Sequence, residues 1–241
     1  MLELHDVVKH YQLGGRSISA VDHVSMTVAA GELVALYGPS GSGKTTLIEL
    51  ISGLKTPDSG RIIVGEREVV GMSRKEARDY RLNDLGMVMN PSTLQPGARA
   101  LTSASIKLMS LLGARAAHKK ITPLMVELGL ADRLGHRVTE LSMGERQRVL
   151  IALALSCEPK LVLADEPTAS LDTENTQSVL GLLRRLCSER GMALLLVTHD
   201  PEGAAYADRV HELRDGRLGE RRSDLRPRDG HPPPLWEREG A

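Results

Sequence analysis

The pattern of hydrophobic and polar positions predicts strands that alternate with helices along most of the chain. Residues 23–28 alternate between apolar and polar positions, as expected for an outer strand with one solvated face. Residues 32–38 and 160–165 are almost continuously apolar, which is typical of strands covered on both faces. Helix-like sequences occupy residues 44–54 and 174–189. Because such alternation is typical of a largely parallel sheet, the expected fold class is α/β.

Turn residues place the remaining strands. One hairpin is expected to turn at Gly65, and a second one at Asp215 and Gly216, where an Asp-Gly pair suits a tight turn. Further apolar strands are expected at 85–89 and 192–199. These elements complete the predicted sheet.

The stretch from residue 91 to residue 137 interrupts the alternation. It has loop character and then two helix-like segments, at 100–112 and 121–130, with no strand pattern between them. We therefore interpret 91–137 as an inserted helical subdomain. Residues 1–90 and 138–218 are expected to form the α/β core on either side of this insertion.

Composition and charge narrow the expected location and partners. Lys and Arg together number 31, as do Asp and Glu, so no global field draws this 241-residue protein to nucleic acid, and no nucleic-acid partner is expected. No apolar stretch approaches the roughly 18 residues of a membrane span, and the N-terminus lacks the apolar run of a secretion signal. A cytoplasmic location is therefore expected. Residues 219–241 are predicted to be disordered, with a docking peptide as the alternative.

A glycine-rich segment at residues 38–45, GPSGSGKT, has the G-x-x-x-x-G-K-Ser/Thr pattern of a phosphate-binding loop between a buried strand and a helix. Its glycines let backbone N–H groups turn towards phosphate, Lys44 adds a positive charge, and the Thr45 hydroxyl suits Mg²⁺. A turn that merely joins strand to helix does not require Lys and Thr at that spacing. The residues expected to bind nucleotide are Gly38, Pro39, Ser40, Gly41, Ser42, Gly43, Lys44, Thr45 and Thr46.

Two adjacent acids, Asp165 and Glu166, end the apolar stretch at 160–165. At the carboxyl end of a buried strand, one carboxylate can hold a metal and the other can activate water. A solvated acidic pair is the alternative. It is disfavoured because four apolar residues precede the acids and Pro167 follows them.

The order of the motifs resembles the ATP-binding cassette (ABC) ATPases. The resemblance covers residues 1–218 and rests on Tyr11 in VVKHY, GPSGSGKT, LSMGERQR at 141–148, LVLADE at 161–166, ASLD ending at Asp172, and VTHD with His199. It implies a P-loop NTPase with a mainly parallel sheet core, an N-terminal antiparallel β part and an inserted helical subdomain. Within the family, the chain is most similar to the ATPases of macrolide exporters, lipoprotein-releasing complexes and the cell-division complex.

The resemblance also implies an ATPase that uses ATP and Mg²⁺. Tyr11 would stack on adenine, while Lys44, Glu166 and His199 would take part in hydrolysis. The implied magnesium ligands are Thr45, Asp165 and Asn90. Family members usually have Gln where this chain has Asn90, whose side chain is shorter by about 1.5 Å.

The segment LSMGERQR carries a second anion site. Ser142 and Glu145 have the capping-box pattern also present at 73–76, which by itself predicts only the start of a helix. A capped helix N-terminus is also an anion site, and the resemblance implies that Ser142, Gly144 and Glu145 meet the γ-phosphate held by a second subunit. Met143 replaces a glycine of the family. If that position requires a positive φ, we expect a cost of about 1–2 kcal/mol.

Three functional classes remain open from the sequence. The first and favoured class is an ATPase subunit that pairs head to tail with an identical or similar cassette and energises an integral-membrane permease. That permease would dock near residues 90–112, on the inner face of the cell membrane. The second class is a soluble ABC ATPase of translation or DNA repair, although no second cassette or coiled-coil insertion is visible. The third is an attenuated cassette that binds ATP structurally, which only Met143 and Asn90 suggest.

Overall fold

The computed structural model describes residues 1–14 and 16–219, so the predicted tail beyond Gly219 lies outside the described residues. The strands are β1 (Leu2–Leu13), β2 (Arg16–Val28), β3 (Leu33–Tyr37), β4 (Ser59–Val64), β5 (Arg67–Glu68), β6 (Leu85–Val88), β7 (Leu161–Asp165), β8 (Ala193–Thr198), β9 (Arg209–Arg214) and β10 (Arg217–Gly219). The helices are α1 (Lys44–Ile51), α2 (Arg74–Asn83), α3 (Ala100–Leu112), α4 (Ala114–Glu127), α5 (Met143–Leu155), α6 (Thr173–Arg190) and α7 (Pro201–Ala204), with 3₁₀ turns at Pro91–Thr93, Ala131–Arg133 and Val138–Glu140.

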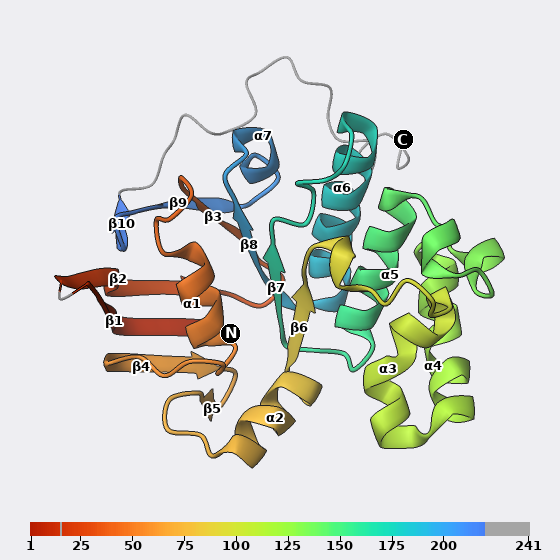
Figure 1. Ribbon diagram of the computed structural model, residues 1–241, viewed down its shortest axis with the longest axis horizontal. Helices are drawn as coiled ribbons and strands as arrows, with labels where there is room; N and C mark the ends of the chain where they lie inside the picture. The colour runs from red at the N-terminus through yellow and green to blue at the C-terminus, as the bar shows by residue number, and fades with distance from the viewer. Residues whose placement is uncertain (15, 220–241) are drawn as a thin grey trace.

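Two sheets organise the chain. The larger has the order β10-β9-β3-β8-β7-β6, and all its neighbours are parallel except the β9–β10 hairpin. The smaller has the order β2-β1-β4-β5 and is antiparallel throughout. Figure 1 shows the antiparallel sheet on the left, the parallel strands in the centre and the longer helices on the right. The predicted α/β fold class, with a parallel core and an antiparallel N-terminal part, is confirmed.

Alternate residues of the central strands enter two separate cores, which explains why their sequences are apolar at nearly every position. Leu194 and Leu196 face a core shared with α3, α4, α5 and α6. Leu195 and Val197 face a second core, formed with α1 and the antiparallel sheet. The helices α1 and α5 therefore pack on opposite faces of the larger sheet, which matters for the site below.

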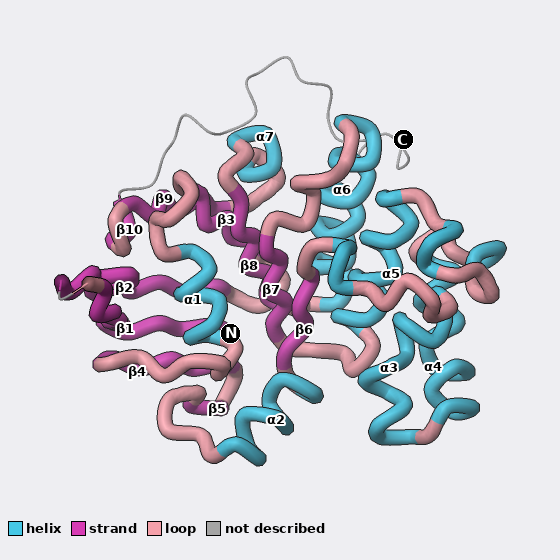
Figure 2. The backbone as a smooth tube through the Cα atoms, viewed as in Figure 1, coloured by secondary structure: helices cyan, strands magenta, loops and turns pink. Residues whose placement is uncertain are grey.

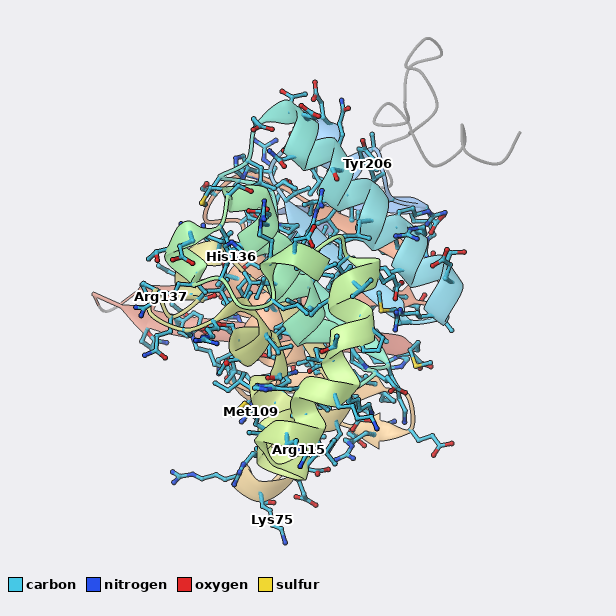
Figure 3. The ribbon with its side chains drawn as sticks, turned by 90° about the vertical axis from the view of Figure 1, so that its right-hand side faces the viewer. Lys75, Met109, Arg115, His136, Arg137 and Tyr206 are labelled. Atoms are coloured by element: carbon cyan, nitrogen blue, oxygen red, sulfur yellow. The ribbon has the colours of Figure 1, made fainter. Side chains whose placement is uncertain are left out.

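Helices α3 and α4 stand beside the sheets and pack on α5 (Figure 2). The ends of this helical segment meet at Arg99 and Arg137, which form an isolated β-bridge. Figure 3 looks onto this side of the protein, with Met109 and Arg115 at one end of the helical pair and His136 and Arg137 towards the other. The Lys107 ammonium also ties α3 to the core, because it donates to the Leu85 carbonyl at 2.8 Å. The boundaries of the subdomain at 91 and 137 remain a prediction.

Several element boundaries differ from the sequence-based expectation. The expected helix at 44–54 ends at Ile51, because Gly53 takes a positive φ of 64° and the chain turns there. The second helix of the insertion starts at Ala114 rather than at residue 121, because the polar run before Ile121 consists of good helix formers. Pro123 lies inside that helix. The short helix α7 was not expected at all.

No helix among residues 1–14 and 16–219 is long and apolar enough to cross a membrane.

Candidate active site

The larger sheet brings four of the predicted site segments to one edge. The phosphate-loop segment follows β3, Asn90 follows β6, the acidic pair ends β7, and His199 follows β8. These four strands are consecutive neighbours in parallel register. Because carboxyl ends of parallel strands meet at the same edge of a sheet, loops far apart in sequence converge there, as ligand sites of open α/β sheets do.

Two glycines of the phosphate-loop segment are required by close backbone contacts. A Cβ on Gly43 would lie 2.1 Å from the Ala20 carbonyl oxygen, and this residue has a φ of 108°. A Cβ on Gly38 would lie 2.2 Å from the Leu213 carbonyl oxygen. The segment is therefore held between β2 and β9, and a side chain at either glycine would displace it.

Lys44 lies within this segment. It is the first residue of α1, it is buried, and its Nζ donates to the carbonyls of Gly38 at 2.7 Å and of Pro39 at 2.8 Å. Burial lowers the pKa of Lys44, while the negative charges of Glu166 and Asp165 oppose that shift. Lys44 and the two acids are thus close enough for their charges to interact.

Asp165 and Glu166 differ in their surroundings. Burial, together with the neighbouring Glu166, raises the pKa of Asp165, and Lys44 acts against that rise. Glu166 contacts the next loop instead, because its Oε1 lies 2.7 Å from Nδ1 of His199. A carboxylate can only accept, so this contact places the ring proton on Nδ1. Glu166 also has a positive φ of 47°, a strained backbone that is concentrated at functional sites.

Tyr11 lies on β1, and the ammonium of Lys55 contacts both its hydroxyl and its ring. Its hydroxyl accepts from Nζ of Lys55 at 3.0 Å, and the same ammonium lies 5.0 Å from the ring centroid. This cation–π contact uses the ring for which the family resemblance implies stacking on adenine. The stacking role remains a prediction.

The LSMGERQR segment begins α5 with the expected capping box. The Ser142 Oγ accepts from the Glu145 N–H at 3.2 Å, and the Glu145 carboxylate accepts from the Ser142 N–H at 2.8 Å. Arg133, from the end of the helical segment, donates to Glu145 at 2.7 Å. The Ser142 N–H, helped by Arg133, lowers the pKa of Glu145. The carboxylate therefore stays ionised and fixes the helix start.

Met143 corrects one expectation. It is the first residue of α5 and is not among the residues with positive φ, so the anticipated strain of about 1–2 kcal/mol does not arise. The side chain is 37% exposed, and its sulfur lies 3.8 Å from a guanidinium nitrogen of Arg146. Arg146 also donates to the Leu141 carbonyl at 3.0 Å. Met143 is thus an exposed apolar side chain that contacts the guanidinium of Arg146.

Replacing Met143 by Gly should therefore lower the free energy of unfolding, by up to about 1 kcal/mol, because glycine is a poor helix former and the contact with Arg146 is lost. Met143→Ala is the matched control and should stay within about 0.5 kcal/mol of the parent protein. Urea unfolding of both variants measures this. A gain in stability for Met143→Gly would instead indicate that the backbone is strained at Met143.

The side chain of Asn90 is hydrogen-bonded within its own loop. Its Oδ1 accepts from the Ser92 N–H at 2.9 Å and so caps the 3₁₀ turn that follows β6. The buried Gln147 of α5 approaches the same loop and donates to the Met89 carbonyl at 3.4 Å. The role of Asn90 as a magnesium ligand remains a prediction.

Contacts of three residues around the start of α5 were missed by the sequence analysis: those of Arg133, Arg146 and Asn175. Asn175 could have been noticed, because it stands three positions after the helix-capping Asp172, where side chains commonly bond back to the cap. No local signal links Arg133 to Glu145, since the contact depends on how the helical segment packs. Among the described residues, no group of three or more His, Cys, Asp or Glu could hold a metal ion by itself.

Comparisons with known proteins point to one family. The family described as "ABC transporter" matches residues 21–169. The chain is 38% identical over 219 residues to the lipoprotein-releasing system ATP-binding protein LolD of Syntrophotalea carbinolica, covering 90% of this chain and 96% of that one. It is 39% identical over 223 residues to the macrolide export ATP-binding/permease protein MacB of Rhodopirellula baltica, covering 91% of this chain but 33% of MacB.

A solved structure has the same fold. The ATP-binding cassette MJ0796, in a dimeric post-hydrolysis state bound to ADP and Pi, superposes with a TM-score of 0.82 at 31% identity, covering 92% of this chain and 97% of that one. The family match, these relatives and the convergence of the motifs at one sheet edge lead to a single conclusion: this chain belongs to the ABC transporter family and is an ATP-binding, ATP-hydrolysing cassette.

Proposed function

We propose that two copies of this cassette, or this cassette and a similar one, pair head to tail, hydrolyse ATP between them and drive a membrane permease. The observation that carries the proposal is the placement of α1 and α5 on opposite faces of the larger sheet. The capped N-terminus of α5 has the geometry of an anion-binding helix start, and α5 packs on the opposite face of the sheet from α1, which follows the phosphate loop. A head-to-tail partner would bring its own phosphate loop to that site. The dimeric MJ0796 structure supports this arrangement.

Each predicted site residue has a proposed task at such a shared site. The backbone N–H groups of residues 40–46 and the Lys44 ammonium would hold the phosphates, with Gly38 and Pro39 forming the start of the loop and Tyr11 against the adenine. Ser142, Gly144 and Glu145 of the partner copy would close on the γ-phosphate. Glu166 would accept a proton from the attacking water, and His199 would orient it.

The residues at the sheet edge also suit Mg²⁺. The Thr45 hydroxyl, the Asp165 carboxylate and, after release from the Ser92 N–H, the Asn90 amide are the hard oxygen ligands that this ion prefers. When bound, Mg²⁺ neutralises charge on the phosphate oxygens. Burial and the neighbouring Glu166 raise the pKa of Asp165, so a cation bound there would favour its ionised form, although the pair of acids alone makes too few ligands.

The permease is proposed to dock beside β6 and α3. Large apolar side chains are exposed there, including Met89, Ile106, Leu111 and Leu112. The relatives point the same way, since LolD is an ATP-binding protein of a lipoprotein-releasing system and MacB is an ATP-binding/permease protein. The location proposed for this chain is therefore the inner face of the cell membrane, through its permease. An attenuated structural cassette is the less supported function, because Met143 carries no backbone strain.

Reconstitution tests the permease assignment. We expect a multi-span membrane protein in an adjacent reading frame. The chain should co-purify with that protein, and its ATPase rate in proteoliposomes should rise several-fold over that of the chain alone. Lys44→Ala, carried through the same preparation, is the control for background hydrolysis. Normal ATPase activity without co-purification or stimulation would favour a soluble, non-transport ATPase.

A further inference from the structure

The side chain of Asn175 joins two parts of the proposed site that the sequence motifs treat separately. Asn175 lies in the first turn of α6, whose N-cap is Asp172. Its backbone N–H donates to Asp172 at 2.8 Å, and its Nδ2 donates to both carboxylate oxygens, at 3.0 and 2.9 Å. These bonds to Asn175, with the Glu174 N–H, lower the pKa of Asp172, which therefore stays an ionised acceptor.

Because Nδ2 faces a carboxylate, the amide orientation of Asn175 is fixed and its oxygen points the other way. It points at Gly144. A Cβ built on Gly144 would lie 2.3 Å from Oδ1 of Asn175 and 2.9 Å from its Cγ. The backbone of Gly144 does not have a positive φ, so the glycine is required by space rather than by conformation. Asn175 is what fills that space.

The link also reaches the catalytic loop of the same chain. Only a short turn separates Glu166 from Asp172, and it is closed by the Ala169 N–H on the Glu166 carbonyl at 3.3 Å and the Leu171 N–H on the Thr168 carbonyl at 3.0 Å. In the proposed dimer, Glu166 serves the ATP of its own chain while Gly144 serves that of the partner. Asp172, Asn175 and Gly144 would therefore connect the two ATP sites within one chain.

We infer that Asn175 is a positioning residue that holds the N-terminus of α5 at Gly144 against the loop ending at Asp172, and so sets the ATP-dependent closure of the dimer. This inference rests on the proposed head-to-tail function. It assigns to Asn175 no contact with nucleotide. Loosening the link should weaken closure and leave ATP binding to the open chain unchanged, because α1, which follows the phosphate loop, packs on the opposite face of the sheet from α5.

The first measurement compares dimerisation with ATP binding, in a Glu166→Gln background that slows hydrolysis. Asn175→Ala should weaken the ATP-dependent dimer roughly tenfold by analytical ultracentrifugation, since the bonds to ionised Asp172 are lost. Binding of a fluorescent ATP analogue to the monomer should stay within about twofold. Gln177→Ala, an exposed amide on the same helix, is the matched control. A merely structural role would lower both quantities together, and that result would overturn the inference.

A second variant gives a signature that a packing defect cannot produce. Asn175→Asp keeps the shape and the oxygen at Gly144 but sets two carboxylates against each other. Such a pair binds one proton more tightly than an isolated acid, and the protonated form can donate as the amide does. Relative to its parent at each pH, dimerisation of Asn175→Asp should be weak at pH 8 and recover towards pH 5, whereas Asn175→Ala should not recover. Parallel profiles for the two variants would overturn the inference.

The contact itself is tested on the monomer, independently of dimerisation. Gly144→Ala should lower the free energy of unfolding in the parent and do so clearly less in an Asn175→Ala background, where the colliding oxygen is gone. Additive effects would remove the basis of the inference. If the Glu166→Gln parent forms no dimer with ATP, the proposed function fails and the inference fails with it. If the parent dimerises and Asn175→Ala does so equally well, only the inference fails.

Discussion

Replacing Glu166 by Gln is expected to lower the rate of ATP hydrolysis by roughly 10²–10⁴-fold, the usual loss when a general base is removed. The same change should convert a mostly monomeric protein into a dimer that persists in ATP. Glutamine has the shape of glutamate but cannot take a proton from water. The ATP-bound state should therefore form normally and fail to break down.

The geometry of the site indicates that this substitution removes the proton acceptor and leaves the loop conformation unchanged. Glu166 has a positive φ that glutamine can adopt at the same cost, and the amide oxygen can still accept from Nδ1 of His199, 2.7 Å from the present carboxylate. The variant should therefore keep the loop conformation. Loss of one negative charge beside Lys44 should, if anything, strengthen binding of the anionic nucleotide.

Size-exclusion chromatography with ATP and Mg²⁺, together with phosphate-release rates, measures both effects. Glu189→Gln, the same substitution at an exposed position near the end of α6, is the control and should match the parent protein. A folded Glu166→Gln variant that binds ATP but remains monomeric at saturating ATP would count heavily against a shared site. Undiminished hydrolysis would show that another group is the base.

Most strands were predictable because each depends on a local property of the sequence. Apolar runs identified β3, β7 and β8, and the parallel arrangement follows from helices between them. The capping boxes at Ser73 and Ser142 were also predictable, since both partners lie within one turn. Both are present in the structure.

The errors arise where distant segments decide the outcome. A glycine in the family's motif signals either a positive φ or a lack of space, and the sequence alone does not separate the two. At Met143 the first explanation was wrong, because the residue has ordinary helical conformation. At Gly144 the second holds, and its cause is Asn175, which lies 31 positions further along the chain by its number and on another helix.

The site illustrates the same limit. Lys44 was found from the phosphate-loop pattern, the acidic pair from its place at the end of an apolar run, and His199 only from the family resemblance. The strands that precede them are neighbours in the larger sheet. The bonds of Tyr11 to Lys55 and of Asn90 to Ser92 were not expected, because they depend on side-chain reach within folded loops. Such contacts must be released if Tyr11 and Asn90 are to act on nucleotide and metal.

Mixing two inactive variants is expected to restore hydrolysis, because each proposed ATP site takes its parts from both chains. Lys44→Ala removes the phosphate-loop charge, and Ser142→Arg removes the cap and blocks the anion site at the start of α5. In a mixed head-to-tail dimer, one site contains both defects and the other contains neither. At equal mixing half of the dimers are mixed, so about a quarter of all sites should be intact.

Ser73→Arg separates this effect from simple loss of a helix cap. Ser73 caps α2 with the same capping box as Ser142, so its replacement should cost a similar amount of stability, about 1 kcal/mol, without abolishing hydrolysis. Mixed dimers isolated through two different affinity tags should hold one slowly exchanging ATP each, whether or not a single site turns over alone. If these dimers hold none, Ser142 does not act on the nucleotide of its partner. If they hold one ATP but do not hydrolyse it, the shared site is correct and both sites must be intact for turnover.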